Sequence, residues 1–141
     1  MALSCKTPLE MEALEGDDDW TRFEVTPAMG RRGFAAWEEA ITQTHLAWTL
    51  KPAPRCNGWV ERHRLGRSHL VACGGNAIAG ERGPRQLASA RQAYFGVLWL
   101  RGGRERVADG GDSATLAPGQ VVLWDSERPL RFEVEADFEK T

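Results

Sequence analysis

The segment from Asp112 to Pro129 constrains this chain more than any other, because it holds two expected strands and a forced turn. Pro118 fixes φ and Gly119 tolerates a positive φ, so we expect a type II turn over Leu116–Gly119. A strand then continues from Val121. Such a corner is typical of a β-barrel, which can enclose a small ligand, whereas a helical bundle has little use for one. The question for function is therefore what lines the interior.

Length and composition indicate one globular domain. The chain has 141 residues, of which 42% are hydrophobic and 27% are charged. No apolar run is long enough for a transmembrane helix, and Met1–Glu10 is too polar for a signal peptide, so we expect no membrane contact. Three cysteines without C-x-x-C spacing predict reduced thiols in the cytoplasm, rather than a disulfide framework or a zinc ribbon.

Charge is distributed unevenly along the chain. Residues 51–106 carry 11 basic and 3 acidic side chains, and the segments on either side are acidic. One interpretation is that the middle segment binds an anionic ligand or nucleic acid. We favour solvated strand faces, because the arginines are spread through several strand-like segments and do not form one block.

The two ends of the chain differ from its middle. Residues 1–19 are rich in carboxylates and poor in apolar anchors, so we expect an acidic, flexible arm followed by a folded domain over residues 20–141. The chain stops at Thr141 without a signal that closes the domain. We therefore expect this chain to be part of a longer protein.

One helix is expected before the strands. Thr26 and Pro27 can begin it, and Phe34, Trp37 and Ile41 recur at spacings of three and four residues. This pattern predicts an amphipathic helix over about 33–44 that packs an aromatic edge against a sheet.

Roughly eight short strands follow, separated by glycine and proline turns. They are expected near 46–50, 59–65, 68–73, 93–100, 105–108, 112–116, 121–125 and 130–135. Ala93–Leu100 is almost wholly apolar, which predicts a strand buried on both faces, whereas Ile78–Leu87 is ambiguous. The regular spacing of turns favours a mainly β sandwich or barrel.

Residues for metal or nucleophilic chemistry are scarce. His45, His63 and His69 are the three histidines, none of them in an H-x-H pair, and none follows residue 69. A catalytic metal needs about three converging protein ligands. We therefore expect no metal, no other cofactor and no catalytic residue.

Tryptophan gives the positive signal for binding. The chain has 6 tryptophans, and Trp59, Trp99 and Trp124 each lie in an expected strand. Ligand cavities are mainly apolar and aromatic with a few polar groups that fix orientation, and His63 shares a strand face with Trp59. We expect these four residues to contact a small, partly apolar effector. The alternative, that the tryptophans only fill the interior, stays open.

Several motifs together resemble a known family. They are Ala36-Trp37-Glu38-Glu39, Gly80-Glu81-Arg82, the run from Tyr94 to Gly102, the Leu-Ala-Pro-Gly corner at Leu116–Gly119 with the strand after it, and Asp125-Ser126-Glu127-Arg128-Pro129. In this order they resemble the amino-terminal effector-sensing domain of AraC/XylS-type transcription regulators over about residues 20–138. The tyrosine that often follows Arg-Pro in that family is Leu130 here.

The resemblance implies a fold and a function. The fold would be a cupin-like double-stranded β-barrel or jelly roll with one N-terminal amphipathic helix. The domain would be a non-catalytic sensor from a cytoplasmic, bacterial-type regulator, and DNA would be contacted only through a C-terminal helix-turn-helix part absent from this chain. A homodimer is left open. Two other interpretations also stay open: a metal-dependent cupin enzyme, such as an isomerase or dioxygenase, and a packed β scaffold that mediates protein contacts.

Overall fold

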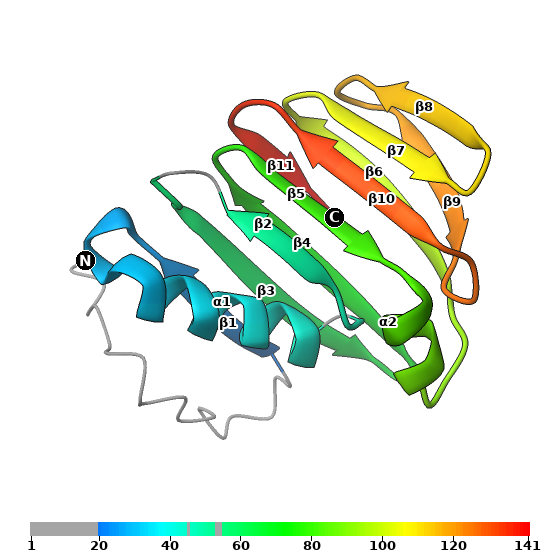
Figure 1. Cartoon of the computed structure of the whole chain (residues 1–141), viewed down its shortest axis with the longest axis horizontal. Coiled ribbons are helices and arrows are strands. Elements are labelled where there is room, and N and C mark those ends of the chain that lie inside the picture. Colours follow the sequence, from blue (N-terminus) through cyan, green and yellow to red (C-terminus); the bar gives the residue numbers. More distant parts are fainter. Residues whose placement is uncertain (1–19, 45, 53–54) are drawn as a thin grey trace.

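The computed structural model describes residues 20–44, 46–52 and 55–141. These residues form two antiparallel sheets that face each other, with one long helix near the N-terminal end of the described chain (Figure 1). The predicted fold class, a mainly β, cupin-like barrel or jelly roll with one N-terminal amphipathic helix, is confirmed, and its two sheets are arranged as a sandwich. The expected arm over residues 1–19 lies outside the described residues, as does His45.

We name the six-stranded sheet A and the five-stranded sheet B. In spatial order, sheet A contains β1 (Trp20–Val25), β3 (Gly58–Leu65), β4 (Ser68–Gly75), β11 (Phe138–Lys140), β6 (Phe95–Gly102) and β9 (Val121–Asp125). Sheet B contains β2 (Thr49–Pro52), β5 (Ile78–Arg82), β10 (Leu130–Val134), β7 (Glu105–Asp109) and β8 (Asp112–Leu116). Successive parts of the sequence are thus divided between the two sheets, and the space between the sheets becomes the interior.

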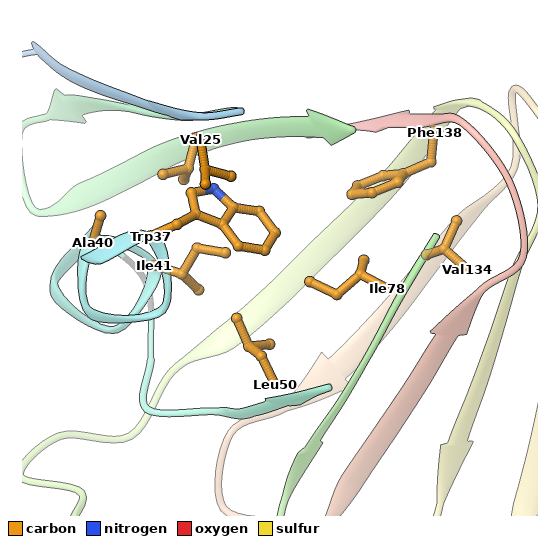
Figure 2. Packing of buried hydrophobic residues seen from close by; sticks show 9 residues of the cluster. Val25, Trp37, Ala40, Ile41, Leu50, Ile78, Val134 and Phe138 are labelled. Atoms are coloured by element: carbon orange, nitrogen blue, oxygen red, sulfur yellow. The ribbon is translucent and has the colours of Figure 1, made fainter. Parts of the chain in front are cut away.

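Helix α1 (Gly30–Thr44) follows a short 3-10 turn, η1 (Pro27–Met29), and begins a few residues before the predicted start. Its predicted apolar stripe is confirmed, because Trp37 is 2% exposed and Ile41 is also buried. The indole of Trp37 points between the sheets and packs with Val25 (Figure 2). Burying a side chain of this size stabilises the fold by about 1.5–3 kcal/mol.

The proline-glycine corner joins β8 to β9 one residue later than predicted. Gln120 N donates to Ala117 O at 3.1 Å, so the four-residue turn is Ala117–Gln120 with Pro118 and Gly119 at its centre. Gly119 has a φ of 88°, which is the positive value that the third residue of a type II turn requires. The side chain of Gln120 closes the turn by accepting a hydrogen bond from Ala117 N at 2.8 Å.

Several elements differ from the sequence predictions. The ambiguous stretch becomes β5 followed by a short helix, α2 (Pro84–Ser89), and neither β1 nor β11 was expected. Strand β6 is not buried on both faces, since Phe95 is 78% and Val97 is 65% exposed on its outer side. The other face of β6 is the one that packs in the interior, where Leu100 is 0% exposed. An apolar run therefore identified the strand but not its burial.

Candidate ligand-binding site

A cavity of about 680 Å³, partly open to solvent, lies between the two sheets. Three aromatic side chains in its wall make edge-on contacts: the ring centroid of Trp48 lies 5.1 Å from that of Phe132 and 6.4 Å from that of Trp124. These residues come from both sheets and from the segment before β2. The volume lies within the range of about 300–1,000 Å³ that small-molecule sites occupy, and the lining has their mainly apolar character.

Glycines opposite aromatic residues keep this space open. Gly96 lies directly across from Trp124 in the β6–β9 pair, and Gly80 lies across from Phe132 in the β5–β10 pair. A Cβ atom at either glycine would collide with the opposite ring. Each ring therefore lies over the glycine of the neighbouring strand, where no side chain projects. A ring that stood away from the sheet would instead fill part of the cavity.

A buried ion pair forms the charged part of the cavity wall. Lys140 Nζ on β11 donates to Glu105 Oε1 on β7 at 2.7 Å, so the pair joins sheet A to sheet B. Glu105 is 0% exposed, and its other oxygen, Oε2, is buried without a hydrogen-bond partner among the described residues. The ammonium of Lys140 also lies 4.1 Å from the ring centroid of Phe132 and 5.5 Å from that of Phe138.

Cys73 lines the cavity beside this pair. It is the register partner of Lys140 in the β4–β11 pair. Removal from water is the main cause that raises the pKa of Cys73 to about 11; the ammonium of Lys140 opposes this rise and the carboxylate of Glu105 adds to it. The side chain is therefore a neutral thiol at physiological pH, and it adds no charge to the cavity wall.

Near the cavity, two segments that carry the family resemblance meet. Arg82, which is 1% exposed, donates from Nη1 to Ala47 O at 2.7 Å and from Nη2 to Ser126 O at 3.2 Å. Ser126 Oγ in turn accepts from Tyr94 N at 2.7 Å. The guanidinium also lies 5.9 Å from the ring centroid of Trp48. Burial lowers the pKa of Arg82, and its partners in the described residues are carbonyl groups and a ring rather than a carboxylate.

Of the four residues predicted to contact an effector, two line the cavity. Trp124 points inward from β9 and packs against the buried cluster around Leu100. Trp99 also borders the cavity, but its side chain is 46% exposed and lies 5.4 Å under the guanidinium of Arg101. The structure therefore brings Trp124 into the interior and leaves Trp99 at the edge.

The other two, Trp59 and His63, lie on the outer face of sheet A and do not line the cavity. Val60 fixes the phase of β3: it is 1% exposed in the core, so its neighbours in sequence point outward. On that outer face, Arg22 lies 4.8 Å from the ring centroid of Trp59, and His63 Nε2 lies 2.9 Å from Glu61 Oε1. Each face of β3 carries both apolar and polar residues, so the alternation did not show which face points inward.

Sequence reasoning missed Glu105, Lys140 and Trp48. A signal for Glu105 existed, because a carboxylate two residues before Val107 shares its strand face with a core residue. Lys140 had no such signal, since its role depends on β11 pairing between β4 and β6. Trp48 precedes β2 and reaches the cavity from a segment without regular structure.

The histidines in the described chain do not converge. His69 is opposite Arg64 on the inner face of sheet A, whereas His63 is on the outer face. In the described ranges, no three histidine, cysteine or carboxylate side chains gather as a metal site would require.

No helix in those ranges is long and apolar enough to cross a membrane.

Fold and site together define a class: a cupin-like sandwich of two sheets around an aromatic cavity that contains one buried ion pair. Residues 37–141 match the family described as the AraC-binding-like domain. The match covers most of the chain, so the chain belongs to this family, which consists of regulatory domains of the AraC type. The resemblance that the sequence motifs indicated is therefore confirmed.

Among solved structures, the chain is similar to the crystal structure of the AraC-like transcriptional activator CuxR. The TM-score is 0.69 at 16% sequence identity, and the likeness covers 85% of this chain but 45% of that one. At this identity the likeness supports the fold, and the chain spans less than half the length of CuxR. A protein of unknown function from Rhizobium leguminosarum bv. viciae 3841 gives a TM-score of 0.30 at 11% identity, over 74% of this chain and 86% of that one. Comparison with curated protein sequences gives no match.

Proposed function

We propose that this domain senses a small, mainly apolar effector, which binds in the cavity between the two sheets. Trp124, together with Trp48 and Phe132, would form the contact surface, and Trp99 would border it. The domain would be non-catalytic and part of a cytoplasmic, bacterial-type regulator. The effector would shift the population of domain conformations, and a DNA-binding part of the full regulator would respond to that shift.

The cavity is the single observation that carries this proposal. A volume of about 680 Å³ with three aromatic side chains in its wall is suited to an apolar ligand. It speaks against the packed scaffold, whose interior would have no room. The likeness to CuxR, an AraC-like transcriptional activator, supports the regulatory context and a DNA-contacting partner domain.

The proposal is tested by blocking the cavity. A panel of small aromatic and aliphatic compounds is screened against the wild-type domain by thermal shift and tryptophan fluorescence. Compounds that raise the melting temperature are then titrated against Val122→Trp, which places a large ring at a half-buried position in the cavity wall. We expect Val122→Trp to lose binding.

Leu123→Trp is the matched control, because Leu123 is the next residue of β9 and is 66% exposed outside the cavity. It should bind the same compounds as the wild type. Binding that survives in Val122→Trp would show that the compounds bind elsewhere, and a panel without any binder would remove the support for a sensing role. Metal analysis of the purified protein tests the remaining rival, since stoichiometric iron, manganese or zinc would favour a cupin enzyme.

A further inference from the structure

Glu105 and Lys140 form the most unusual polar feature of the interior. The carboxylate is completely buried and one of its oxygens is paired, while Oε2 has no partner among the described residues. A buried acceptor without a donor is costly, and natural structures keep such groups when water or a ligand satisfies them. The ammonium has three N–H donors, of which one is directed to Glu105 Oε1. The pair thus has both acceptor and donor capacity left.

The net charge of this pair limits what can bind beside it. A carboxylate and an ammonium at 2.7 Å sum to zero, and Cys73 next to them is a neutral thiol. Beside the pair, a second cation would be repelled by Lys140, and an anion would be repelled by Glu105 while losing its own hydration. A neutral polar group avoids both costs. The other cationic side chains of the cavity wall, Arg62 and Arg67, would favour an anion elsewhere in the cavity, which the phenylacetate probe below tests.

We propose that the effector of this domain carries a neutral hydroxyl group on an apolar body, and that the hydroxyl donates to Glu105 Oε2 while accepting a hydrogen bond from Lys140 Nζ. A hydroxyl is the smallest neutral group that offers one donor and an acceptor at the same atom. The aromatic walls formed by Phe132, Trp124 and Trp48 receive the apolar body. This inference rests on the proposed function and specifies the ligand class of the same cavity.

We expect a water molecule to take the same position when no effector is bound. A bound water would satisfy Oε2 and one N–H of Lys140, and an alcohol would replace it without losing either hydrogen bond. A hydrocarbon of the same shape would displace the water and leave Oε2 unpaired. The cavity should therefore distinguish an alcohol from its hydrocarbon, not merely accept both.

Four matched probes with one ring and one short chain test this ranking: phenethyl alcohol, ethylbenzene, phenylacetate and phenethylammonium. Their dissociation constants are measured on the wild-type domain by ligand-observed NMR. We expect the alcohol to bind about 10-fold to 100-fold more tightly than each of the others, which is the ratio that a hydrogen bond to a charged group produces.

The variant Glu105→Gln removes the negative charge but keeps the shape of the side chain. Lys140 then has no counter-charge, so we expect the alcohol to lose its advantage and phenylacetate to become the tightest of the four probes. Glu139→Gln is the matched control, because Glu139 precedes Lys140 on β11 but pairs with Arg101 on the outer face. It should keep the wild-type ranking. If Glu105→Gln does not fold, Lys140→Met provides the opposite test, and phenethylammonium should then bind best.

The outcomes distinguish a failure of the hydroxyl inference from a failure of the proposed sensing function. If ethylbenzene binds the wild type as tightly as the alcohol, the cavity is a binding site but the hydroxyl inference is wrong. The same holds if phenylacetate binds the wild type best, since Arg62, which also lines the cavity, would then select the ligand. If none of the four probes binds, the sensing function loses its support as well.

Discussion

Arg82 and Ser126 are 44 residues apart in sequence, and the guanidinium Nη2 of the first donates to the main-chain oxygen of the second at 3.2 Å. The same guanidinium holds Ala47 O, so one buried cation ties the segment before β2 to the turn between β9 and β10. Ser126 then fixes Tyr94, one residue before β6 begins. The Gly-Glu-Arg and Asp-Ser-Glu-Arg-Pro motifs are thus one structural unit, which positions three segments around the cavity.

This unit predicts that Arg82→Met destabilises the domain. Methionine keeps much of the side-chain volume but leaves the carbonyls of Ala47 and Ser126 without donors, at a cost of about 1–3 kcal/mol for each. Part of this loss is offset because the variant no longer buries a charge. We expect a net decrease of about 1–3 kcal/mol in the free energy of unfolding, measured by urea denaturation. The exposed Arg85→Met serves as control and should change it by less than about 0.5 kcal/mol. Equal midpoints for Arg82→Met and wild type would contradict the assigned role.

Gly96→Ala should also destabilise the domain, because the added methyl group collides with the indole of Trp124. Displacing a packed ring costs about 1–3 kcal/mol, and the ring would move toward the cavity. Thermal denaturation measures the first effect, and weaker binding of apolar probes measures the second. Gly111→Ala is the matched control, since a Cβ atom there meets nothing within 4 Å. A Gly96→Ala domain as stable as Gly111→Ala would show that the ring does not lie over this glycine.

An ion-paired cluster on the outer face of sheet A predicts how the stability of the domain depends on pH. Burial alone would raise the pKa of Glu61, but hydrogen bonds from His63 and Arg22 outweigh it and hold the pKa below the ordinary value of 4.5. A lowered carboxylate pKa stabilises the fold above the unfolded pKa, and this stabilisation is lost as pH falls through the folded pKa. We therefore expect the unfolding free energy of the wild type to drop between about pH 5 and pH 3.

In Glu61→Gln this acid-dependent drop should be smaller. The group is partly solvated, so the variant should lose less than about 1 kcal/mol at neutral pH. Glu81→Gln, which removes the exposed partner of Arg131, should retain the wild-type pH profile. Identical profiles for Glu61→Gln and wild type would mean that this ion-paired cluster does not form in solution.

Cys73 should react slowly with thiolate-directed reagents. Its pKa of about 11 lies above the ordinary value of 9.0, so the thiolate fraction at about pH 8 falls about 100-fold. Mass spectrometry of iodoacetamide-treated protein measures the alkylation of this residue in the folded domain against that in urea. A folded-state rate within a factor of about three of the unfolded rate would refute the burial of this thiol.

Sequence patterns predicted those parts of the fold that local chemistry determines. The stripe of Trp37 and Ile41 located α1, and the alternation of Leu130 and Phe132 with charged residues defined β10 and its inner face. Pro118 and Gly119 located the corner to within one residue. In α1 and β10, one face is apolar and the other is polar, so the sequence of that single element shows which face is buried. The turn is determined by the backbone preferences of its own two residues.

The candidate site was predictable only in part, because it depends on which strands become neighbours. Trp124 lines the cavity, while its contact with an effector stays a prediction; the inner face of β3 depends on Val60 joining the buried cluster around Trp37. The pairing of Glu105 with Lys140 depends on two strands from different sheets that are 35 residues apart. No local pattern contains such information, since both residues resemble ordinary surface charges when read alone.

Under the proposed sensing function, the Glu105–Lys140 contact has one further consequence for how the domain would respond to a ligand. Its two members are anchored in opposite sheets, so the length of this contact reports the distance between the two sheets at that point. A molecule inserted between these groups would act as a wedge and force the halves of the sandwich to slide or part, whereas one that sits against the aromatic wall alone would leave their spacing unchanged. A ligand could therefore bind in the cavity without changing the spacing of the two sheets, and only a ligand that separates Glu105 from Lys140 would change it.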